Sequence, residues 1–433
     1  MTFLRPLAAL LFLALPAQAE VPIKEVTSPG GITAWLVESH DIPFTALDIR
    51  FKGGTSLDAE GKRGATNLMT ALLEEGAGDM DASAFATARD DLAAEFRFSS
   101  NSDAVAVSAR FLTENRDQAA DLLHLALTEP RFDDNAIQRV RAQVLSGIRS
   151  AAQDPDAIAG DTFNAEAFGP HPYGSDDSGT LDSVAALTRD DLVAAQDGAL
   201  ARDRIYVAAA GDISEADLGA LLDRILGDLP ATGAPQPGPA EWRATGGTTV
   251  VDFPTPQAVV RFGQPGIDVH DPDFMAAFVA NEVLGGGRFT ARLMDELRTQ
   301  RGLTYGASAY LASLDHADMI VGQFASDNDK VAEAVDVTKQ VWEGIAQDGI
   351  TQEELDAAKT YLTGSYPLRF DGNGPIAGIL VGMQMQGFPI DYPTTRNARI
   401  EALTLDEVNR VAKTLYDPSA LRFVVVGQPQ GLE

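Results

Sequence analysis

The sequence predicts an α+β fold of two duplicated lobes, each a mainly antiparallel sheet covered by helices. Two observations carry this prediction. The two halves of the chain end in the same pattern of helix, loop and strand, and a stretch rich in Pro, Gly and Ala divides them almost evenly. The chain has 433 residues, of which 45% are hydrophobic and 22% charged, so its composition is globular and its length suits two domains of ordinary size.

The first segment, residues 1–19, has the features of a secretory signal peptide. Arg5 gives it a positive start, residues 7–15 form an apolar run too short to span a bilayer, and Ala17-Gln18-Ala19 is an A-x-A cleavage signal. A short membrane anchor is the alternative interpretation. We expect the mature chain to begin at Glu20 and to be soluble, in the periplasm or outside the cell, with no membrane partner.

Charge and cysteine content exclude several kinds of function. The formal net charge is −30, and an acidic surface repels phosphate backbones, which argues against nucleic acid as a partner. The chain has no cysteine, so thiol catalysis and cysteine-ligated metal are excluded. Its stability must come from hydrophobic cores rather than from disulfides.

The first lobe is predicted over residues 20–228. Runs of β-branched and apolar residues predict its strands, and apolar residues at helical spacing predict its longest helix. The strands are expected at Ile32–Val37, at Phe44–Lys52 and, as a hairpin, within residues 99–112, and the helix is expected at Asn135–Ala151.

The second lobe is predicted over residues 248–433. The linker before it, residues 229–247, has the Pro, Gly and Ala content typical of a connection between domains. The same signals as in the first lobe predict strands at Val250–Phe253, at Ala258–Phe262 and, as a hairpin, within residues 304–324, and a helix at Lys330–Gln347.

The ends of the two lobes are alike in every element. In both, Leu-Thr precedes a helix, and Thr188 and Thr404 are the predicted N-caps, each followed by acidic residues in the first helical turn. A short loop then leads to an apolar strand that ends in Gly211 or Gly427, at the same distance from the capping threonine. Matching helix, loop, strand and spacing indicate a duplication.

Motifs for the common catalytic and metal sites are absent from the sequence. The five histidines stand apart, and none belongs to H-x-x-E-H or H-E-x-x-H, so we expect no metal bound by this chain. There is no G-x-S-x-G. Gly285-Gly286-Gly287 is followed by Arg288-Phe289 rather than by the Lys-Ser or Lys-Thr of a P-loop. These glycines form either a tight junction between elements or a backbone wall that a peptide can approach closely.

The segment after these glycines brings two hydrogen-bond donors together. Thr290 is the predicted cap of a helix, Arg298 lies on its last turn, and Gly302 suits its end. A strand is expected from Leu303 onward, and it would carry Tyr305. A guanidinium and a phenol are both donors at neutral pH, and such a pair suits a carbonyl oxygen that gains charge. The alternative is that the arginine caps the helix end and the tyrosine packs in the core, which is the commoner use of such residues.

The segment resembles the insulinase family of zinc peptidases, which includes pitrilysin and the mitochondrial processing peptidases. The most specific match is G-G-G…L…E-L-R-x-x-R-G-L-x-Y from Gly285 to Tyr305. Gly169-Pro-His-Pro-Tyr-Gly174, the L-T-x-x-D-L start at Leu187 and the duplicated lobes support it, so the resemblance covers both halves. It implies a processing-peptidase-like fold.

The resemblance also implies that the first lobe has lost its metal site. The family has H-x-x-E-H in a helix that corresponds here to the stretch beginning at Gly64. The two histidine positions fall on Asn67 and Ala71, the general-base glutamate on Thr70, and the third ligand near Gly147. Ala and Gly have no ligating side chain, and Thr cannot act as a carboxylate base.

The second lobe, unlike the first, matches the functional residues of the family. In the family, an arginine and a tyrosine at the positions of Arg298 and Tyr305 reach across to the zinc site and bind the substrate near the scissile carbonyl. The resemblance therefore implies the non-zinc-binding subunit of a heterodimeric peptidase. Its partner would be a homologous H-x-x-E-H subunit that holds the zinc, the attacking water and the glutamate base. A peptide would be the substrate, with Gly285, Gly286 and Gly287 beside it.

Two other interpretations remain open from the sequence. A degenerate family member could serve as a peptide-binding module or an assembly scaffold, as core subunits of respiratory complexes do within the family. A homodimer with unrelated chemistry is also possible, although no nucleophile and base are visible to support it.

Overall fold

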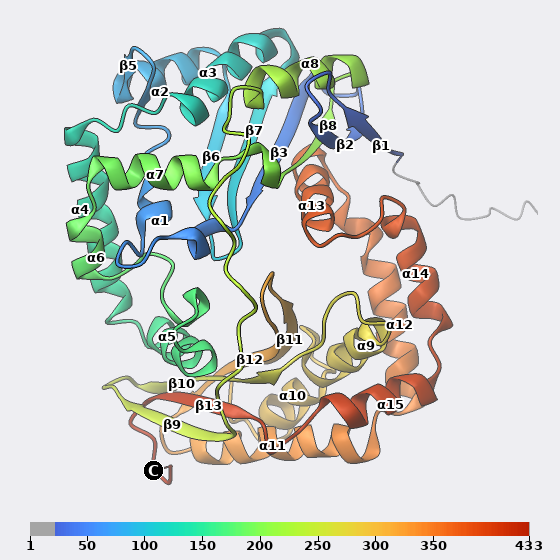
Figure 1. The fold of residues 1–433 in the computed structure, drawn as a ribbon. Helices are drawn as coiled ribbons and strands as arrows, with labels where there is room; N and C mark the ends of the chain where they lie inside the picture. The colour runs from blue at the N-terminus through green and yellow to red at the C-terminus, as the bar shows by residue number, and fades with distance from the viewer. Residues whose placement is uncertain (1–21, 433) are drawn as a thin grey trace, which may run out of the picture.

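The computed structural model describes residues 22–432, in which two sheets form the centres of two lobes (Figure 1). The first sheet has six strands and the second has five. The predicted signal peptide, residues 1–19, lies outside the described residues. Within residues 22–432, no helix is both long enough and apolar enough to cross a membrane.

The first lobe takes its sheet and most of its helices from the first half of the chain. The strands are β1 (Ile23–Thr27), β2 (Thr33–Glu38), β3 (Phe44–Lys52), β6 (Glu95–Ser100), β7 (Ala104–Leu112) and β8 (Ile205–Gly211), with the small pair β4 (Gly76–Ala77) and β5 (Met80–Asp81) outside the sheet. The helices of this half are α1 (Ala65–Thr70), α2 (Ala82–Asp91), α3 (Arg116–Thr128), α4 (Asp134–Ala151), α5 (Pro155–Phe168), α6 (Leu181–Ala186), α7 (Arg189–Ala199) and α8 (Glu215–Leu226).

The second half supplies the second sheet. Its strands are β9 (Gly247–Asp252), β10 (Gln257–Pro265), β11 (Ala307–Ser313), β12 (Asp318–Asp327) and β13 (Arg422–Gly427). Its helices are α9 (Phe274–Gly285), α10 (Arg292–Met294), the π-helix η5 (Asp295–Gln300), α11 (Val331–Asp348), α12 (Gln352–Ser365), α13 (Asn373–Met385), α14 (Tyr392–Ala402) and α15 (Leu405–Leu415).

The two sheets have the same topology. In the first, β2 runs parallel to β8, and β8, β3, β7 and β6 follow in antiparallel order. In the second, β9 runs parallel to β13, and β13, β10, β12 and β11 follow in antiparallel order. Each of these runs contains one parallel pair, and β1 adds an antiparallel edge strand to the first sheet. The prediction of two similar, mainly antiparallel lobes is confirmed.

The predicted lobe ends are confirmed in detail. Thr188 and Thr404 each accept a hydrogen bond from the third residue of the helix they cap, and that residue's carboxylate bonds back to them, which makes a capping box. The strands that follow, β8 and β13, both end in glycine. A Cβ atom on Gly211 would lie 2.3 Å from the carbonyl oxygen of Phe44, so only glycine lets β3 approach this closely.

Each lobe is completed by a helix from the other half of the chain. Helix α13 packs on β3 and β8 of the first sheet, and α5 packs on β10 and β13 of the second (Figure 1). Phe163 of α5 and Leu380 of α13 are fully buried at these contacts. Burial of one such side chain stabilises the fold by about 1.5–3 kcal/mol, so the exchange of helices fixes the two lobes to each other.

The segment that connects α8 of the first lobe to β9 of the second is held against both lobes. Residues 230–246 contain no helix or strand. Along this segment the Ala234 amide donates to the Gly198 carbonyl (2.9 Å), and the Ala240 amide donates to the His316 carbonyl (2.8 Å). The His171 ring bonds to the Gly238 carbonyl (3.1 Å). The stretch predicted as a linker from its composition is therefore fixed to both lobes by hydrogen bonds and is not a flexible connection.

Candidate functional site

Helix α1, which the resemblance matches to the zinc motif, is held at its start by a buried carboxylate. Asp58 accepts hydrogen bonds from the amides of Gly64 and Thr66, both at 2.8 Å, and so satisfies two donors at the helix N-terminus. Gly64 adopts a φ of +91°, which glycine tolerates best. Burial raises the pKa of Asp58, against the effect of the amides of Thr66 and Gly64.

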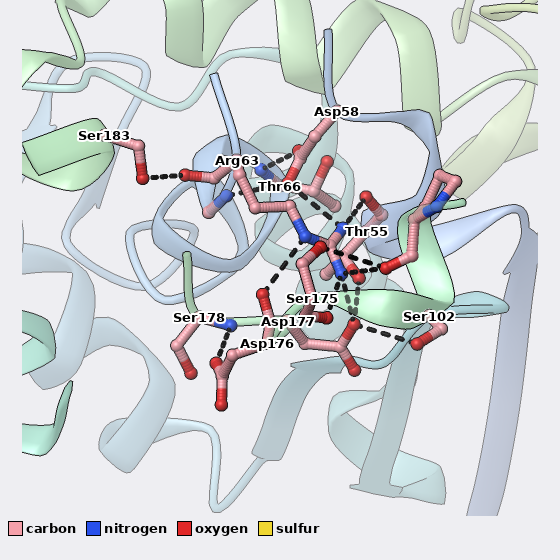
Figure 2. Close-up of polar contacts among 12 residues, drawn as sticks. Thr55, Asp58, Arg63, Thr66, Ser102, Ser175, Asp176, Asp177, Ser178 and Ser183 are labelled. Carbon is pink, nitrogen blue, oxygen red and sulfur yellow. Dashed lines mark hydrogen bonds and ion pairs between the residues drawn. The ribbon is translucent and has the colours of Figure 1, made fainter. Parts of the chain in front are cut away.

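Arg63 ties this helix start to the loop of residues 171–179 (Figure 2). Its guanidinium donates to the backbone carbonyls of four residues and to one carboxylate, and its side chain is 15% exposed. The carbonyl acceptors are Thr55, Pro172, Ser175 and Asp176, and the carboxylate is that of Asp177 at 3.0 Å. We call these contacts the Arg63 network. It holds the helix in place although the helix carries no zinc ligands.

The side chains at the four motif positions do not fit a zinc ion. Asn67 and Ala71 lie one helical turn apart, and the helix ends at Thr70, just before Ala71. The buried Thr70 hydroxyl donates back to the Thr66 carbonyl (2.7 Å). Gly147 lies on α4 with open space where a side chain would begin. Among residues 22–432, no group of three or more His, Cys, Asp or Glu side chains is placed to hold a metal ion.

The three glycines after α9 have different surroundings. Gly285 and Gly286 are buried. A Cβ atom on Gly285 would lie 2.6 Å from the Ala309 amide nitrogen, so this glycine allows α9 to approach β11 closely. Gly287 is exposed and lines a cavity of about 440 Å³ together with residues of β11 and β12. Of the three, Gly287 is therefore the one a peptide could reach.

The segment that carries Arg298 differs from the predicted helix. Ala291, rather than Thr290, precedes the first turn, because the Asp295 amide donates to the Ala291 carbonyl (2.9 Å). The prediction of a Thr290 cap is wrong. The short helix α10 then widens into the π-helix η5, which contains Arg298. Single π-helical turns are rare and occur often at functional sites.

The end of this segment matches the prediction more closely. Gly302 adopts a φ of +62°, and its amide donates to the Arg298 carbonyl (3.0 Å). The Leu303 amide donates to the Leu297 carbonyl (2.7 Å), which closes the turn. Leu297 is fully buried, so the segment is anchored in the core of the second lobe while Arg298 is only partly buried.

Four arginines lie between residues 288 and 301, and three of them pair with a carboxylate. Arg288 bonds to Glu282 (2.8 Å), Arg292 to Glu354 (2.7 Å) and Arg301 to Glu296. Arg298 is the exception: within residues 22–432 its side chain makes no hydrogen bond and no ion pair, and its guanidinium lies over the Phe289 ring at 4.6 Å. Its donors remain available, so the alternative in which it caps a helix end does not fit.

Tyr305 is 80% exposed, so the core-packing alternative does not fit it either. The strand expected from Leu303 begins only at Ala307, and Tyr305 lies in a bend before it. The physical reason is Thr304, whose hydroxyl bonds to both the amide (3.1 Å) and the carbonyl (2.9 Å) of Gly306 and closes this bend. The clamp turns Tyr305 outward.

Two neighbours of the predicted pair were not identified from the sequence. Thr304 has a local signal, because a threonine two residues before a glycine is typical of a side-chain-closed turn. Phe289 has none, since its contact with Arg298 depends on the loop between α9 and α10 folding back over the π-helix.

Two family models match the chain. One, described as Insulinase (Peptidase family M16), covers residues 34–180, and the other, described as Peptidase M16 inactive domain, covers residues 186–362. A solved structure of a peptidase M16 inactive domain from Pseudomonas fluorescens is similar with a TM-score of 0.88 and 27% sequence identity. The match covers 95% of this chain and 100% of that one.

Two curated relatives extend the comparison. A Helicobacter pylori protein named Non-peptidase homolog YmxG is 28% identical over 393 residues, which is 90% of each chain. A Caenorhabditis elegans protein named mitochondrial-processing peptidase subunit beta is 22% identical over 342 residues, which is 74% of this chain and 72% of that protein. Both matches span the two lobes.

Proposed function

Because the chain belongs to the insulinase family, peptidase family M16, we propose that it is the non-zinc-binding subunit of a heterodimeric zinc peptidase. The partner is a homologous subunit with H-x-x-E-H, which holds the zinc and the general base. This chain contributes Arg298 and Tyr305, which bind the peptide at the partner's site. The predicted signal peptide supports an exported pair, acting in the periplasm or outside the cell.

The observation that carries the proposal is the unpaired state of Arg298. Three arginines of the same segment have carboxylate partners, whereas Arg298 has no hydrogen-bond acceptor among the described residues. An arginine that served only the fold would gain from such a partner, because a charge-assisted pair is among the stronger polar contacts. The open donors of Arg298 and the exposed Tyr305 are suited to a ligand that arrives from outside.

The chemistry of the pair suits the charge that develops during peptide hydrolysis. When water attacks a peptide carbonyl, its oxygen becomes negative, and donors aimed at that oxygen stabilise the transition state more than the ground state. The Arg298 guanidinium and the Tyr305 hydroxyl both donate at neutral pH. The exposed Gly287 offers a stretch of backbone that a peptide can approach without meeting a side chain.

A scaffold role is the second candidate, and one observation favours it. The Helicobacter pylori relative, similar over both lobes, is named a non-peptidase homolog. A scaffold would use the fixed lobes and their surfaces and would have no need of open donors. The two candidates therefore differ in what Arg298 does when a peptide is present.

The test begins with an exported protein of similar length that carries H-x-x-E-H and copurifies with this chain. We expect the mixed pair to cleave an unfolded peptide, and we expect this cleavage to stop when a chelator is added. Arg298→Ala should lower turnover by about 10²–10³-fold, the usual cost of losing one such donor. Arg301→Ala is the matched control, because it removes an arginine of the same segment that is already paired with Glu296.

Three results would contradict the proposal. Full activity of the pair with Arg298→Ala would remove the proposed role of the arginine. Stoichiometric zinc together with hydrolysis by the isolated chain would show a metal site that the first lobe is proposed to lack. Cleavage by the H-x-x-E-H protein alone, unchanged when this chain is added, would favour the scaffold role.

A further inference from the structure

Phe289 is an exposed aromatic residue with one notable contact. Its side chain is 63% exposed, in the loop between α9 and α10, and its ring centre lies 4.6 Å from the Arg298 guanidinium carbon. Single exposed apolar residues are common on protein surfaces, so the exposure of Phe289 alone indicates no role. The feature that points to a role for Phe289 is the cation–π contact of its ring with the Arg298 guanidinium.

The loop that carries Phe289 is fixed on both sides. On one side, Arg288 bonds to Glu282 (2.8 Å) and lies over the Tyr361 ring (4.9 Å). On the other side, Ala291 is fully buried in the second lobe. The backbone at Phe289 is therefore held between two anchored neighbours, which keeps the ring within reach of the guanidinium.

We propose that Phe289 is a positioning residue that orients the Arg298 guanidinium for the incoming peptide, an inference that rests on the proposed function. A carboxylate partner would fix an arginine by occupying its N–H donors, as in the three paired arginines. An aromatic face attracts the cation through the ring's negative π surface and leaves the donors in the guanidinium plane open.

The physical benefit is that the arginine is already ordered when the peptide carbonyl oxygen gains its negative charge. A free arginine side chain carries about 2 kcal/mol of rotamer entropy, and ordering it in advance reduces the cost of forming each hydrogen bond. An alternative role for Phe289 is direct contact with a side chain of the peptide. The two roles predict different kinetics, because the first acts on turnover and the second on substrate binding.

The first experiment uses the isolated chain and does not depend on a partner. In an isotope-labelled sample, the Arg298 side-chain N–H signal is identified by its loss in Arg298→Lys. We expect this signal to be shifted upfield by the Phe289 ring. The shift should persist in Phe289→Tyr and disappear in Phe289→Leu, which keeps apolar bulk without a π face. A signal that is the same in the wild type and in Phe289→Leu would overturn the stack.

The second experiment measures peptide cleavage by the reconstituted pair. Phe289→Leu should lower kcat by about two- to fivefold, the range that an exposed cation–π contact supplies, with KM within twofold of the wild type. Phe289→Tyr should restore kcat. A raised KM with unchanged kcat would overturn the positioning role in favour of peptide contact, and kinetics identical to the wild type would overturn both roles.

The two experiments together separate failure of this inference from failure of the proposed function. If Arg298→Ala lowers activity but Phe289→Leu leaves both the signal and kcat unchanged, only the positioning role falls. If Arg298→Ala is fully active, the proposed function falls and the positioning role with it, even where the ring-current shift is present.

Discussion

Two arginines, one in each lobe, show how differently the same side chain can be used. Arg63 in the first lobe donates to four backbone carbonyls and one carboxylate, so its donors are used within the fold (Figure 2). The side chain of Arg298 in the second lobe makes no hydrogen bond within residues 22–432, and its guanidinium lies over an aromatic ring. The donors of the first arginine serve the fold, whereas those of the second have no partner among the described residues.

The difference teaches how a duplicated fold can divide its roles. In the first lobe, Asp58 and the Arg63 network hold the start of α1, the helix that the resemblance matches to the zinc motif, with Asn67 and Ala71 at the expected ligand positions. The second lobe keeps a pair of donors. The position of α1 therefore does not depend on a metal site. The contacts that hold the start of this helix go mainly to backbone groups and do not require a metal ligand.

The largest expected effect comes from removing Arg63. Arg63→Ala leaves four backbone carbonyls without their donor and the carboxylates of Asp58 (3.7 Å) and Asp177 (3.0 Å) without their cation, and we expect a loss of about 3–5 kcal/mol in the free energy of unfolding. Arg298→Ala is the matched control and should cost no more than about 1 kcal/mol, the worth of an exposed cation–π contact. Urea denaturation of the isolated chain measures both. Equal losses for the two variants would remove the distinction between the arginines.

A smaller effect is expected from the clamp behind Tyr305. Thr304→Val keeps the shape of the side chain but removes the hydroxyl that bonds to Gly306, so we expect a loss of about 1 kcal/mol in stability. The bend should also open more often. Cleavage by chymotrypsin after Tyr305, followed by mass spectrometry, should accelerate about fivefold, as that free energy implies.

Thr290→Val is the control for the clamp, because Thr290 is exposed and lies outside the bend. It should change neither stability nor cleavage measurably. If Thr304→Val is cleaved at the wild-type rate, the exposure of Tyr305 does not depend on the threonine, and the outward turn must come from the glycines and core residues around it.

Local signals in the sequence were sufficient for most of the elements. Strand β3 occupies the predicted residues Phe44–Lys52, and α4 begins one residue before the predicted Asn135. The capping threonines Thr188 and Thr404 act as predicted. These features depend on neighbours three or four residues away, so the chain itself contains the information. The second strand hairpin was placed correctly, but its first strand starts at Ala307 because Thr304 closes a bend before it.

Features that depend on distant contacts could not be predicted in this way. Nothing local shows that α5 and α13 pack on the sheet of the other lobe, since the apolar residues of a helix do not indicate which sheet it will cover. The Arg63 network could not be predicted from the sequence either, because four of its acceptors are backbone carbonyls, which every residue has. Arg298 and Tyr305 were found through the family resemblance, whereas the absence of a carboxylate beside Arg298 required the structure.

The smallest expected effect concerns Arg292, a paired arginine next to Arg298 along the segment. Its partner Glu354 also closes the capping box of α12 with Thr351. Burial opposes the ionisation of Glu354, but hydrogen bonds from Arg292 and Thr351 outweigh it and hold the pKa of this carboxyl below its ordinary value. The pair therefore contributes stability above the pKa of the unfolded chain, roughly 4.3, and this contribution is lost as the pH falls through the folded pKa.

Glu354→Gln should therefore lower the free energy of unfolding by about 1 kcal/mol at pH 7, and the difference from the wild type should shrink as the pH falls through the folded-state pKa of this carboxyl. Glu353→Gln, at the exposed neighbouring position, should change little across the same pH range. Peptide cleavage by the reconstituted pair should be unaffected, because the Arg292 pair serves the fold. If Glu354→Gln instead lowered turnover as much as Arg298→Ala, paired and unpaired arginines would not differ in function. The unpaired donors of Arg298 would then no longer indicate a role in peptide cleavage.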